Sequence, residues 1–151
     1  MATNSNFRDL LHALNTANAK YLLIGAYAVS YYSEPRYTKD FDLWIASDVA
    51  NVERIWNALA NFGAPLDQIT KEDLRNPQAI YQIGVAPNRF DILVQPGNLS
   101  FDDAWKRRVE SNYDGEKLPI VAREDLIKLK EFSGRPQDLL DIQSLKINRT
   151  K

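Results

Sequence analysis

The chain contains no cysteine and a single histidine, His12, among its 151 residues. The absence of cysteine excludes disulfide bonds, thiolate nucleophiles and thiolate metal ligands. One histidine cannot form a cluster of imidazole ligands. No apolar run approaches the roughly 18 residues of a membrane-spanning helix, and the N-terminus lacks the basic and apolar parts of a secretory signal. We therefore expect a cytoplasmic protein without a membrane anchor, whose chemistry uses carboxylates, hydroxyls, amines, guanidinium groups and the backbone.

An excess of charge of one sign is also lacking. The formal net charge is −1, so no strong basic field attracts nucleic acid indiscriminately. Hydrophobic residues make up 44% of the chain and charged residues 26%, which argues against disorder. No linker, repeat or low-complexity tract divides the chain, and its length suits one domain. We expect a single domain over residues 1–151.

Helix and strand patterns alternate along the chain. Apolar residues recur with helical spacing in some segments, and short β-branched or aromatic runs occur in others. The patterns predict helices near 5–19, 26–32, 48–62, from 100, 123–131 and 136–147, and strands near 21–24, 40–45, 79–84, 89–95 and, weakly, 118–121. Residues 66–78 are predicted to be irregular. The fold class is α/β, with a small mixed β-sheet packed by helices and a helical tail at about 123–147.

Two aspartates, Asp40 and Asp42, lie on the predicted strand at 40–45. Side chains two apart on a strand point to the same face, so both carboxylates would meet while the apolar residues between them face a core. Adjacent like charges destabilise a fold unless a cation lies between them. Mg²⁺ is the expected cation, with Mn²⁺ as an alternative, because hard divalent ions prefer oxygen ligands.

A third aspartate, Asp91, lies on the predicted strand at 89–95. If this strand lies beside the one at 40–45, Asp91 joins Asp40 and Asp42. Three carboxylates at one point can hold two metal ions about 4 Å apart, an arrangement that serves phosphoryl transfer. Alternatively, Asp91 is a charge that protects an edge strand from aggregation.

A glycine, Gly25, follows the predicted strand at 21–24 and precedes the next helix. Glycine permits a tight turn and close approach of a ligand, and a helix N-terminus offers free amides to a phosphate. The Gly25 and Ala26 amides are therefore predicted phosphate ligands. A strand, a glycine turn, a D-x-D pair and a single aspartate form a coherent site for a nucleoside triphosphate with Mg²⁺.

These segments resemble the nucleotidyltransferase fold of the polymerase-beta superfamily. The likeness rests on Leu23-Ile24-Gly25-Ala26-Tyr27-Ala28, Arg36-x-Thr38-x-Asp40-x-Asp42 and Arg89-Phe90-Asp91. More closely, the chain is similar to small bacterial proteins related to the toxin of abortive-infection toxin–antitoxin systems, whose helical tail matches residues 121–130 and 135–142. The resemblance spans residues 20–145 and implies that Asp40, Asp42 and Asp91 are catalytic metal ligands, with Asp91 also a general base.

The same resemblance implies that Lys130 reaches the triphosphate. Arg36, Thr38 and Lys39, just before the first aspartate, are further candidates for phosphate contacts. The chain departs from the family at the turn, where Gly25-Ala26 replaces Gly-Gly or Gly-Ser and removes a hydroxyl. Simpler interpretations remain: Lys130 as a surface lysine, and Arg36 and Lys39 as solvated loop charges.

Other conspicuous residues have structural explanations. Asp138 and Asp141 lie three apart on a predicted helix, where they would compensate the helix dipole or pair with Lys130 or Arg135. His12 is expected to be exposed and inert. The three tryptophans are expected in the core or at its rim, rather than as platforms for stacking bases.

The expected function is metal-dependent transfer of a nucleoside monophosphate from a triphosphate to a hydroxyl acceptor, with release of pyrophosphate. The acceptor, a protein hydroxyl, a tRNA end or a small molecule, is not decided by the sequence. The alternative is a catalytically degenerate binding module, such as a toxin–antitoxin component that acts through a protein partner. An aminoglycoside-type transferase is disfavoured because the chain is short for a fold that also carries a dedicated acceptor-binding domain.

Overall fold

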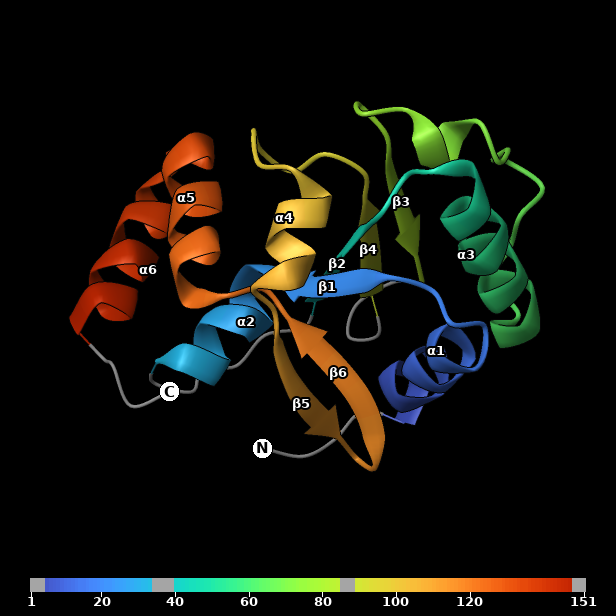
Figure 1. The fold of residues 1–151 in the computed structure, drawn as a ribbon, viewed down its shortest axis with the longest axis horizontal. Helices are drawn as coiled ribbons and strands as arrows, with labels where there is room; N and C mark the ends of the chain where they lie inside the picture. The colour runs from blue at the N-terminus through green and yellow to red at the C-terminus, as the bar shows by residue number, and fades with distance from the viewer. Residues whose placement is uncertain (1–4, 34–39, 85–88, 148–151) are drawn as a thin grey trace.

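The fold was analysed in a computed structural model that describes residues 5–33, 40–84 and 89–147. Helices and strands follow one another along most of this length, as the sequence patterns predict (Figure 1). In chain order the elements are α1 (Ser5–Thr16), β1 (Tyr21–Ile24), α2 (Gly25–Tyr32), β2 (Asp40–Ile45), α3 (Val49–Phe62), the 3-10 turn η1 (Asp73–Arg75), β3 (Ile80–Ile83), β4 (Arg89–Leu93), α4 (Phe101–Lys106), β5 (Val109–Tyr113), β6 (Glu116–Ile120), α5 (Arg123–Ser133) and α6 (Pro136–Ile147).

The strands form one mixed sheet in the order β3-β4-β2-β1-β6-β5. The pairs β2–β4 and β1–β6 are parallel, and the other neighbours are antiparallel. Helices α1 and α3 lie together on one side of the molecule, while α5 and α6 form a pair on the other (Figure 1). The predicted α/β class with a mixed sheet and a helical tail is therefore confirmed.

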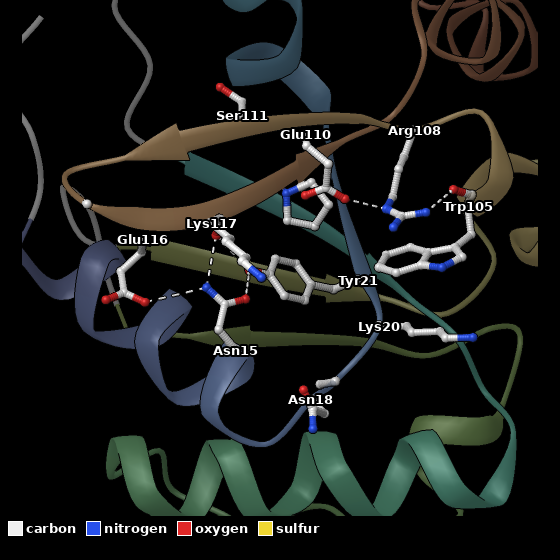
Figure 2. Close-up of a pocket in the computed structure, with 13 residues that line it drawn as sticks. Asn15, Asn18, Lys20, Tyr21, Trp105, Arg108, Glu110, Ser111, Glu116 and Lys117 are labelled. Atoms are coloured by element: carbon white, nitrogen blue, oxygen red, sulfur yellow. Dashed lines mark hydrogen bonds and ion pairs between the residues drawn. The ribbon is translucent and has the colours of Figure 1, made fainter.

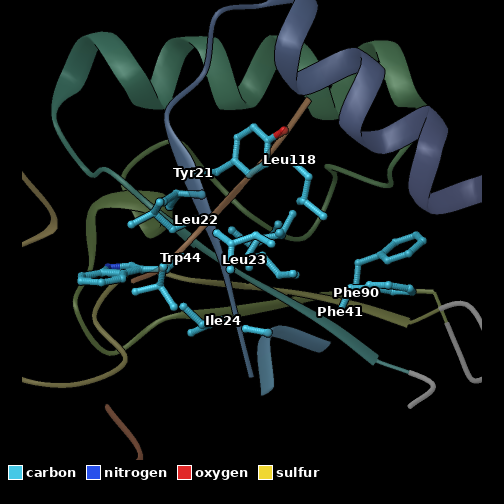
Figure 3. Packing of buried hydrophobic residues seen from close by; sticks show 14 of the residues in the cluster. Tyr21, Leu22, Leu23, Ile24, Phe41, Trp44, Phe90 and Leu118 are labelled. Carbon is cyan, nitrogen blue, oxygen red and sulfur yellow. The ribbon is translucent and has the colours of Figure 1, made fainter. Parts of the chain in front are cut away.

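The alternation of side chains along β2 separates a core face from a polar face. Phe41 stacks on Phe7 of α1, with ring centroids 3.8 Å apart, and lies near Phe90 of β4 (Figure 3). Trp44 points the other way, packs edge-on against Phe101 of α4 and donates a hydrogen bond to the Val94 carbonyl over 3.1 Å. Because side chains two apart share a face, Asp40 and Asp42 lie on the Trp44 side of the strand.

Asn51 fixes the corner between α1, β1 and the start of α3. Its buried side chain accepts a hydrogen bond from the Lys20 amide over 2.7 Å and donates to the carbonyls of Lys20 and Ala46. Its own amide donates to Asp48, which caps α3; the sequence had left this cap open between Ser47 and Asp48. The start of β1 is thereby held in register with the end of β2.

The hairpin β5–β6 is the main element that the sequence patterns missed. Only a weak strand near 118–121 was expected, and residues 109–113 were unassigned. The turn between the strands is Asp114-Gly115, and both residues have positive φ, 50° and 88°. This pair favours a type I′ hairpin turn, but the many charged residues around it obscure the strand pattern.

No helix among the described residues combines the length and apolarity needed to cross a membrane.

Candidate active site

The parallel register of β2 and β4 brings Asp42 and Asp91 side by side. Asp42 lies opposite Asp91, and Asp40 lies opposite Arg89. In a parallel pair, residues at matching positions point to the same face, so these four side chains form a square on the polar face. We call them the acidic square. Since β4 lies between β3 and β2, the alternative that Asp91 guards an edge strand is wrong.

Asp42 lies directly against the glycine turn. Ile24, the last residue of β1, is in register with Asp42, and Gly25 follows with φ of +76°. A Cβ added to Gly25 would lie 2.2 Å from the Asp42 Oδ2 atom. Glycine is required here both for the left-handed backbone and for the room that the carboxylate occupies. The Gly25 turn and β2 are thus packed directly against each other at Asp42.

The surroundings of Asp42 disfavour its charged form. Burial, the largest cause, and the charges of Asp91 and Asp40 raise the pKa of Asp42 to about 7, against an opposing effect of Lys130. A hydrogen bond with Asp91 also favours the protonated form. A cation bound between Asp42 and Asp91 would favour the charged form of both carboxylates and so lower the pKa of Asp42.

Arg89 contacts Asp91 from within the acidic square. Its Nε donates to Oδ1 and its Nη2 to Oδ2 of Asp91, each over 3.2 Å. The Asp91 side chain is only 12% exposed, whereas that of Arg89 is 37% exposed. Hydrogen bonding to Asp91 raises the pKa of Arg89 above its ordinary value, and the charges of Asp40 and Asp42 contribute. Sequence reasoning missed this residue, although its spacing of two from Asp91 on a strand was a usable signal.

Lys130 is buried, so its interpretation as a surface lysine is wrong. Its Nζ lies 3.0 Å from Asp138 Oδ1 and 3.1 Å from Asp141 Oδ2, and both aspartates are also buried. Asp138 further accepts hydrogen bonds from the amide and the Nε of Arg135. Burial alone would raise the pKa of Asp138, but the hydrogen bonds from Arg135, Ser133 and Lys130 bring it below its ordinary value. The expected ion pairs between α5 and α6 are therefore confirmed.

The predicted phosphate ligands fall into two groups. Gly25 and Ala26 form the first turn of α2, where no side-chain hydrogen bond caps the helix, so no capping side chain competes for the amides of this turn, and their role as phosphate ligands stays a prediction. Arg36, Thr38 and Lys39 lie outside the described residues, as do residues 85–88 of the predicted hairpin connection.

The acidic square suits a divalent cation in its chemistry. Carboxylate oxygens are the ligands that Mg²⁺ and Mn²⁺ prefer, and burial together with the neighbouring charges of Asp91 and Asp40 raises the pKa of Asp42. Within the described ranges, however, no group of three or more His, Cys, Asp or Glu side chains is close enough to hold a metal ion. The neighbouring pair Asp42 and Asp91 thus fits the ion, and the full three-carboxylate site stays a prediction.

A separate cavity of about 770 Å³ opens at the opposite end of β1 (Figure 2). Its lining includes Trp105, with the Arg108 guanidinium carbon 3.9 Å from the ring centroid and Lys20 Nζ at 5.8 Å. The predicted position of Trp105 at the rim of the core is confirmed, but two cations accompany it. None of Gly25, Asp42 and Asp91 contributes to this cavity.

His12 is exposed, as predicted, and its Nδ1 lies 3.1 Å from Glu116 Oε2.

Comparison with known proteins identifies the fold. No protein-family model and no curated protein matches the chain. Among solved structures, the lincomycin-bound lincosamide antibiotic adenylyltransferase LnuA is similar over 97% of this chain and 98% of its own, with a TM-score of 0.58 and 18% identity. A candidate nucleotidyltransferase from Thermotoga maritima is similar over 95% and 91%, with a TM-score of 0.63 and 11% identity.

An antigenic nucleotidyltransferase-like protein from Paracoccidioides brasiliensis is similar over 93% of this chain and 74% of its own, with a TM-score of 0.57 and 18% identity. All three likenesses span nearly the whole chain, so the sheet and its helices, including the C-terminal pair, together form the shared architecture. The chain has the nucleotidyltransferase fold.

Proposed function

We propose that this protein is a divalent-metal-dependent nucleotidyltransferase. It transfers a nucleoside monophosphate from a nucleoside triphosphate to a hydroxyl acceptor and releases pyrophosphate. The observation that carries the proposal is the adjacency of Asp42 and Asp91, in register on parallel strands and directly against the Gly25 turn. The shared fold supports it, although a fold by itself does not determine an activity.

Each part of the site has a role in this reaction. Asp42 and Asp91, with Asp40 beside them, hold the metal, which neutralises phosphate oxygens when bound. The amides of Gly25 and Ala26 bind phosphate oxygens at the start of α2. The acceptor oxygen forms a bond to the α-phosphorus, the bond from this phosphorus to the pyrophosphate oxygen breaks, and Asp91 accepts the hydroxyl proton.

Lys130 lies near enough to Asp42 to affect its charge, and it supplies positive charge at the α5 side of the site. The departing pyrophosphate gains negative charge in the transition state, which a positioned cation stabilises. Arg36, Thr38 and Lys39 stay candidates for phosphate contacts on sequence grounds.

The acceptor is a protein hydroxyl, a tRNA end or a small molecule. LnuA is an antibiotic adenylyltransferase with lincomycin bound, and the likeness covers 98% of its chain. A chain of this extent can therefore serve a small acceptor, so the length argument against a resistance-type transferase loses its force. We expect the protein to act in the cytoplasm.

The second candidate is a degenerate binding module that acts through a protein partner, such as a toxin–antitoxin component. Exposed apolar side chains on the C-terminal helices favour it: Phe132, Leu139, Leu140 and Ile147, each 56% to 82% exposed. The engagement of Lys130 by two buried aspartates and the lack of a hydroxyl at Ala26 point the same way. In this case the protein would bind its partner without nucleotide.

Isothermal titration of ATP, GTP, CTP and UTP, with and without Mg²⁺, tests the proposal. At least one triphosphate should bind only with the metal, and Asp42→Asn should abolish this binding. Asp102→Asn, an exposed aspartate of α4, is the control and should bind as the wild type does. Absence of binding for all four nucleotides would favour the binding module.

Transfer of an α-phosphate label then separates the acceptors. The labelled triphosphate is incubated with the protein alone, with pooled tRNA and with hydroxyl-bearing antibiotics. Label on one of the three identifies the acceptor class, and label on none, despite tight binding, would contradict transferase activity towards these acceptors.

A further inference from the structure

Arg89 occupies the position in the acidic square where a cation is needed. It lies opposite Asp40 across the β2–β4 pair and two residues before Asp91 on the same strand. Both spacings direct its side chain to the face that carries the three aspartates. The guanidinium of Arg89 therefore occupies one corner of the acidic square, and carboxylates occupy the other three.

The contact with Asp91 uses both carboxylate oxygens. The two donors of the guanidinium fork lie 3.2 Å from Oδ1 and 3.2 Å from Oδ2. A fork on both oxygens takes up a lone pair on each, and the guanidinium cannot lose its proton at accessible pH. A divalent ion that binds Asp91 must therefore share this carboxylate with Arg89 or displace the guanidinium.

Displacement is open to Arg89 because its side chain is not locked into the core. More than a third of the side chain is exposed, at 37%, while its partner Asp91 is 12% exposed. Once Arg89 leaves Asp91, its charge needs another anion within reach of the side chain. The phosphates of a bound nucleotide would provide that anion, since the guanidinium fork matches phosphate oxygens as it matches a carboxylate.

We infer that Arg89 is a resident counter-cation that competes with the divalent metal for Asp91 and is released by a triphosphate. Metal alone binds weakly, because it must displace the guanidinium from Asp91, and the other carboxylates of the square, Asp40 and Asp42, are themselves ligands of the metal in our proposal. Metal and triphosphate together bind well, because the phosphates accept Arg89 and leave Asp91 to the metal. This rests on the proposed function, and it makes metal and nucleotide binding reciprocal: each raises the affinity of the other by the same factor.

The test measures metal binding without any reaction. Mn²⁺ binding to the full chain is followed by electron paramagnetic resonance, with and without a triphosphate analogue that cannot be hydrolysed between its α- and β-phosphates. Arg89→Ala should bind Mn²⁺ alone about 5- to 150-fold more tightly than wild type, the usual range of such couplings. The analogue should raise Mn²⁺ affinity by a similar factor in wild type and by much less in Arg89→Ala.

Arg108→Ala is the matched control. Arg108, the residue before β5, also pairs with an acid two residues later, Glu110, but it lines the separate cavity, to which no residue of the acidic square contributes. Its Mn²⁺ affinity should equal that of the wild type. Arg89→Gln, which keeps length and loses charge, should behave as Arg89→Ala and replaces it if the alanine variant is unfolded by circular dichroism.

The outcomes separate this inference from the proposed function. If Arg89→Ala and Arg89→Gln bind Mn²⁺ no more tightly than wild type, Arg89 is not a competitor and the inference is wrong, even where wild type binds triphosphate with metal. If the variants gain Mn²⁺ affinity but no protein binds a triphosphate, competition is supported, while release by nucleotide and the proposed function are both wrong.

Discussion

Gly25→Ala tests the contact on which the candidate site depends. Two separate effects act at this position. Alanine must adopt the left-handed backbone at φ of +76°, and its methyl group would lie 2.2 Å from Asp42 Oδ2 and 3.0 Å from Asp42 Cγ. The first effect is local to the backbone, and the second reaches the carboxylate that binds the metal in our proposal.

The two effects have different magnitudes. A left-handed conformation costs an L-residue about 1–2 kcal/mol, of which the reduced entropy of the unfolded chain returns about 0.4–1 kcal/mol. Forcing a methyl group into occupied space costs a further 1–3 kcal/mol or so. We therefore expect Gly25→Ala to lower the free energy of unfolding by about 2–4 kcal/mol, of which about 1 kcal/mol is backbone strain.

Gly63→Ala separates the effects. Gly63 ends α3 with φ of +94°, and an added Cβ there meets no atom within 4 Å. Urea denaturation should show a loss of only about 1 kcal/mol for this variant, the strain alone. Titration with Mg²⁺ and triphosphate should show normal binding for Gly63→Ala and severe loss for Gly25→Ala, because Asp42 must move.

A double-mutant cycle gives the sharpest result. In an Asp42→Ala background the methyl group no longer meets a carboxylate, so Gly25→Ala should cost about 1–3 kcal/mol less than in wild type, which is the overlap alone. Equal losses for Gly25→Ala and Gly63→Ala, with nucleotide binding intact in both, would refute the argument that Asp42 lies in the space above the turn.

Four further predictions concern charged side chains and the corner that Asn51 holds together. In metal-free buffer, Asp42→Asn should raise the free energy of unfolding at pH 8 by up to about 4 kcal/mol, since a pKa raised from 3.8 to about 7 costs the folded state about 1.36 kcal/mol per pKa unit. This gain in stability should shrink as the pH falls through 7 and vanish near pH 4, where the wild-type carboxyl is protonated. A gain that urea denaturation shows to be independent of pH would contradict the prediction. Lys130→Met should destabilise the fold by about 3–5 kcal/mol at pH 7, because it removes the amine that contacts the buried carboxylates of Asp138 and Asp141. The substitution Lys128→Met, at an exposed lysine of the same helix, should change stability by about 0.5 kcal/mol or less; similar melting temperatures for both variants would refute the buried network. Because hydrogen bonds lower the pKa of Asp138 in the folded protein, its carboxylate stabilises the fold at pH values above the ordinary carboxyl pKa, and this stabilisation is lost as the pH falls below that value. Asp138→Asn should therefore be less stable than wild type at neutral pH, and its stability should depend less on pH in acid denaturation. Asn51→Ala should cost about 2–3 kcal/mol through three lost side-chain hydrogen bonds, and triphosphate affinity measured by calorimetry should stay unchanged in the folded protein.

The sequence predicted the elements that carry a strong local signal. The spacing of apolar residues identified α1 and α3, and the break at residues 133–136, with Pro136 suited to a first helical turn, divided the two C-terminal helices. Alternation on β2 separated Asp40 and Asp42 from the core side chains. These features depend on neighbours within a few residues, so the pattern of one segment is sufficient to reveal them.

Other elements were missed because their signal depends on distant partners. β5 has a charged, half-exposed sequence, and it is a strand because β6 pairs with it through the Asp114-Gly115 turn. The role of Lys130 was open between a surface and a site residue, because burial by α6 cannot be read from α5 alone. Arg89 differs from these: it was named beside Asp91 in the sequence motif but given no role, although its spacing of two from Asp91 on a strand is a local signal.

By itself, the sequence determined the inventory of the site: aspartates, one glycine turn, a lysine and no sulfur or imidazole chemistry to compete with them. Local spacing also determined which face of β2 holds the carboxylates, since a strand alternates with a period of two. Only the tertiary structure decided that β4 runs parallel beside β2 in a register that matches Asp42 with Asp91, that Asp42 fills the space above Gly25, and that Arg89 and Lys130 supply the nearby positive charge. The physical reason is that register and burial arise from contacts between segments far apart in the chain, where local pattern carries no information.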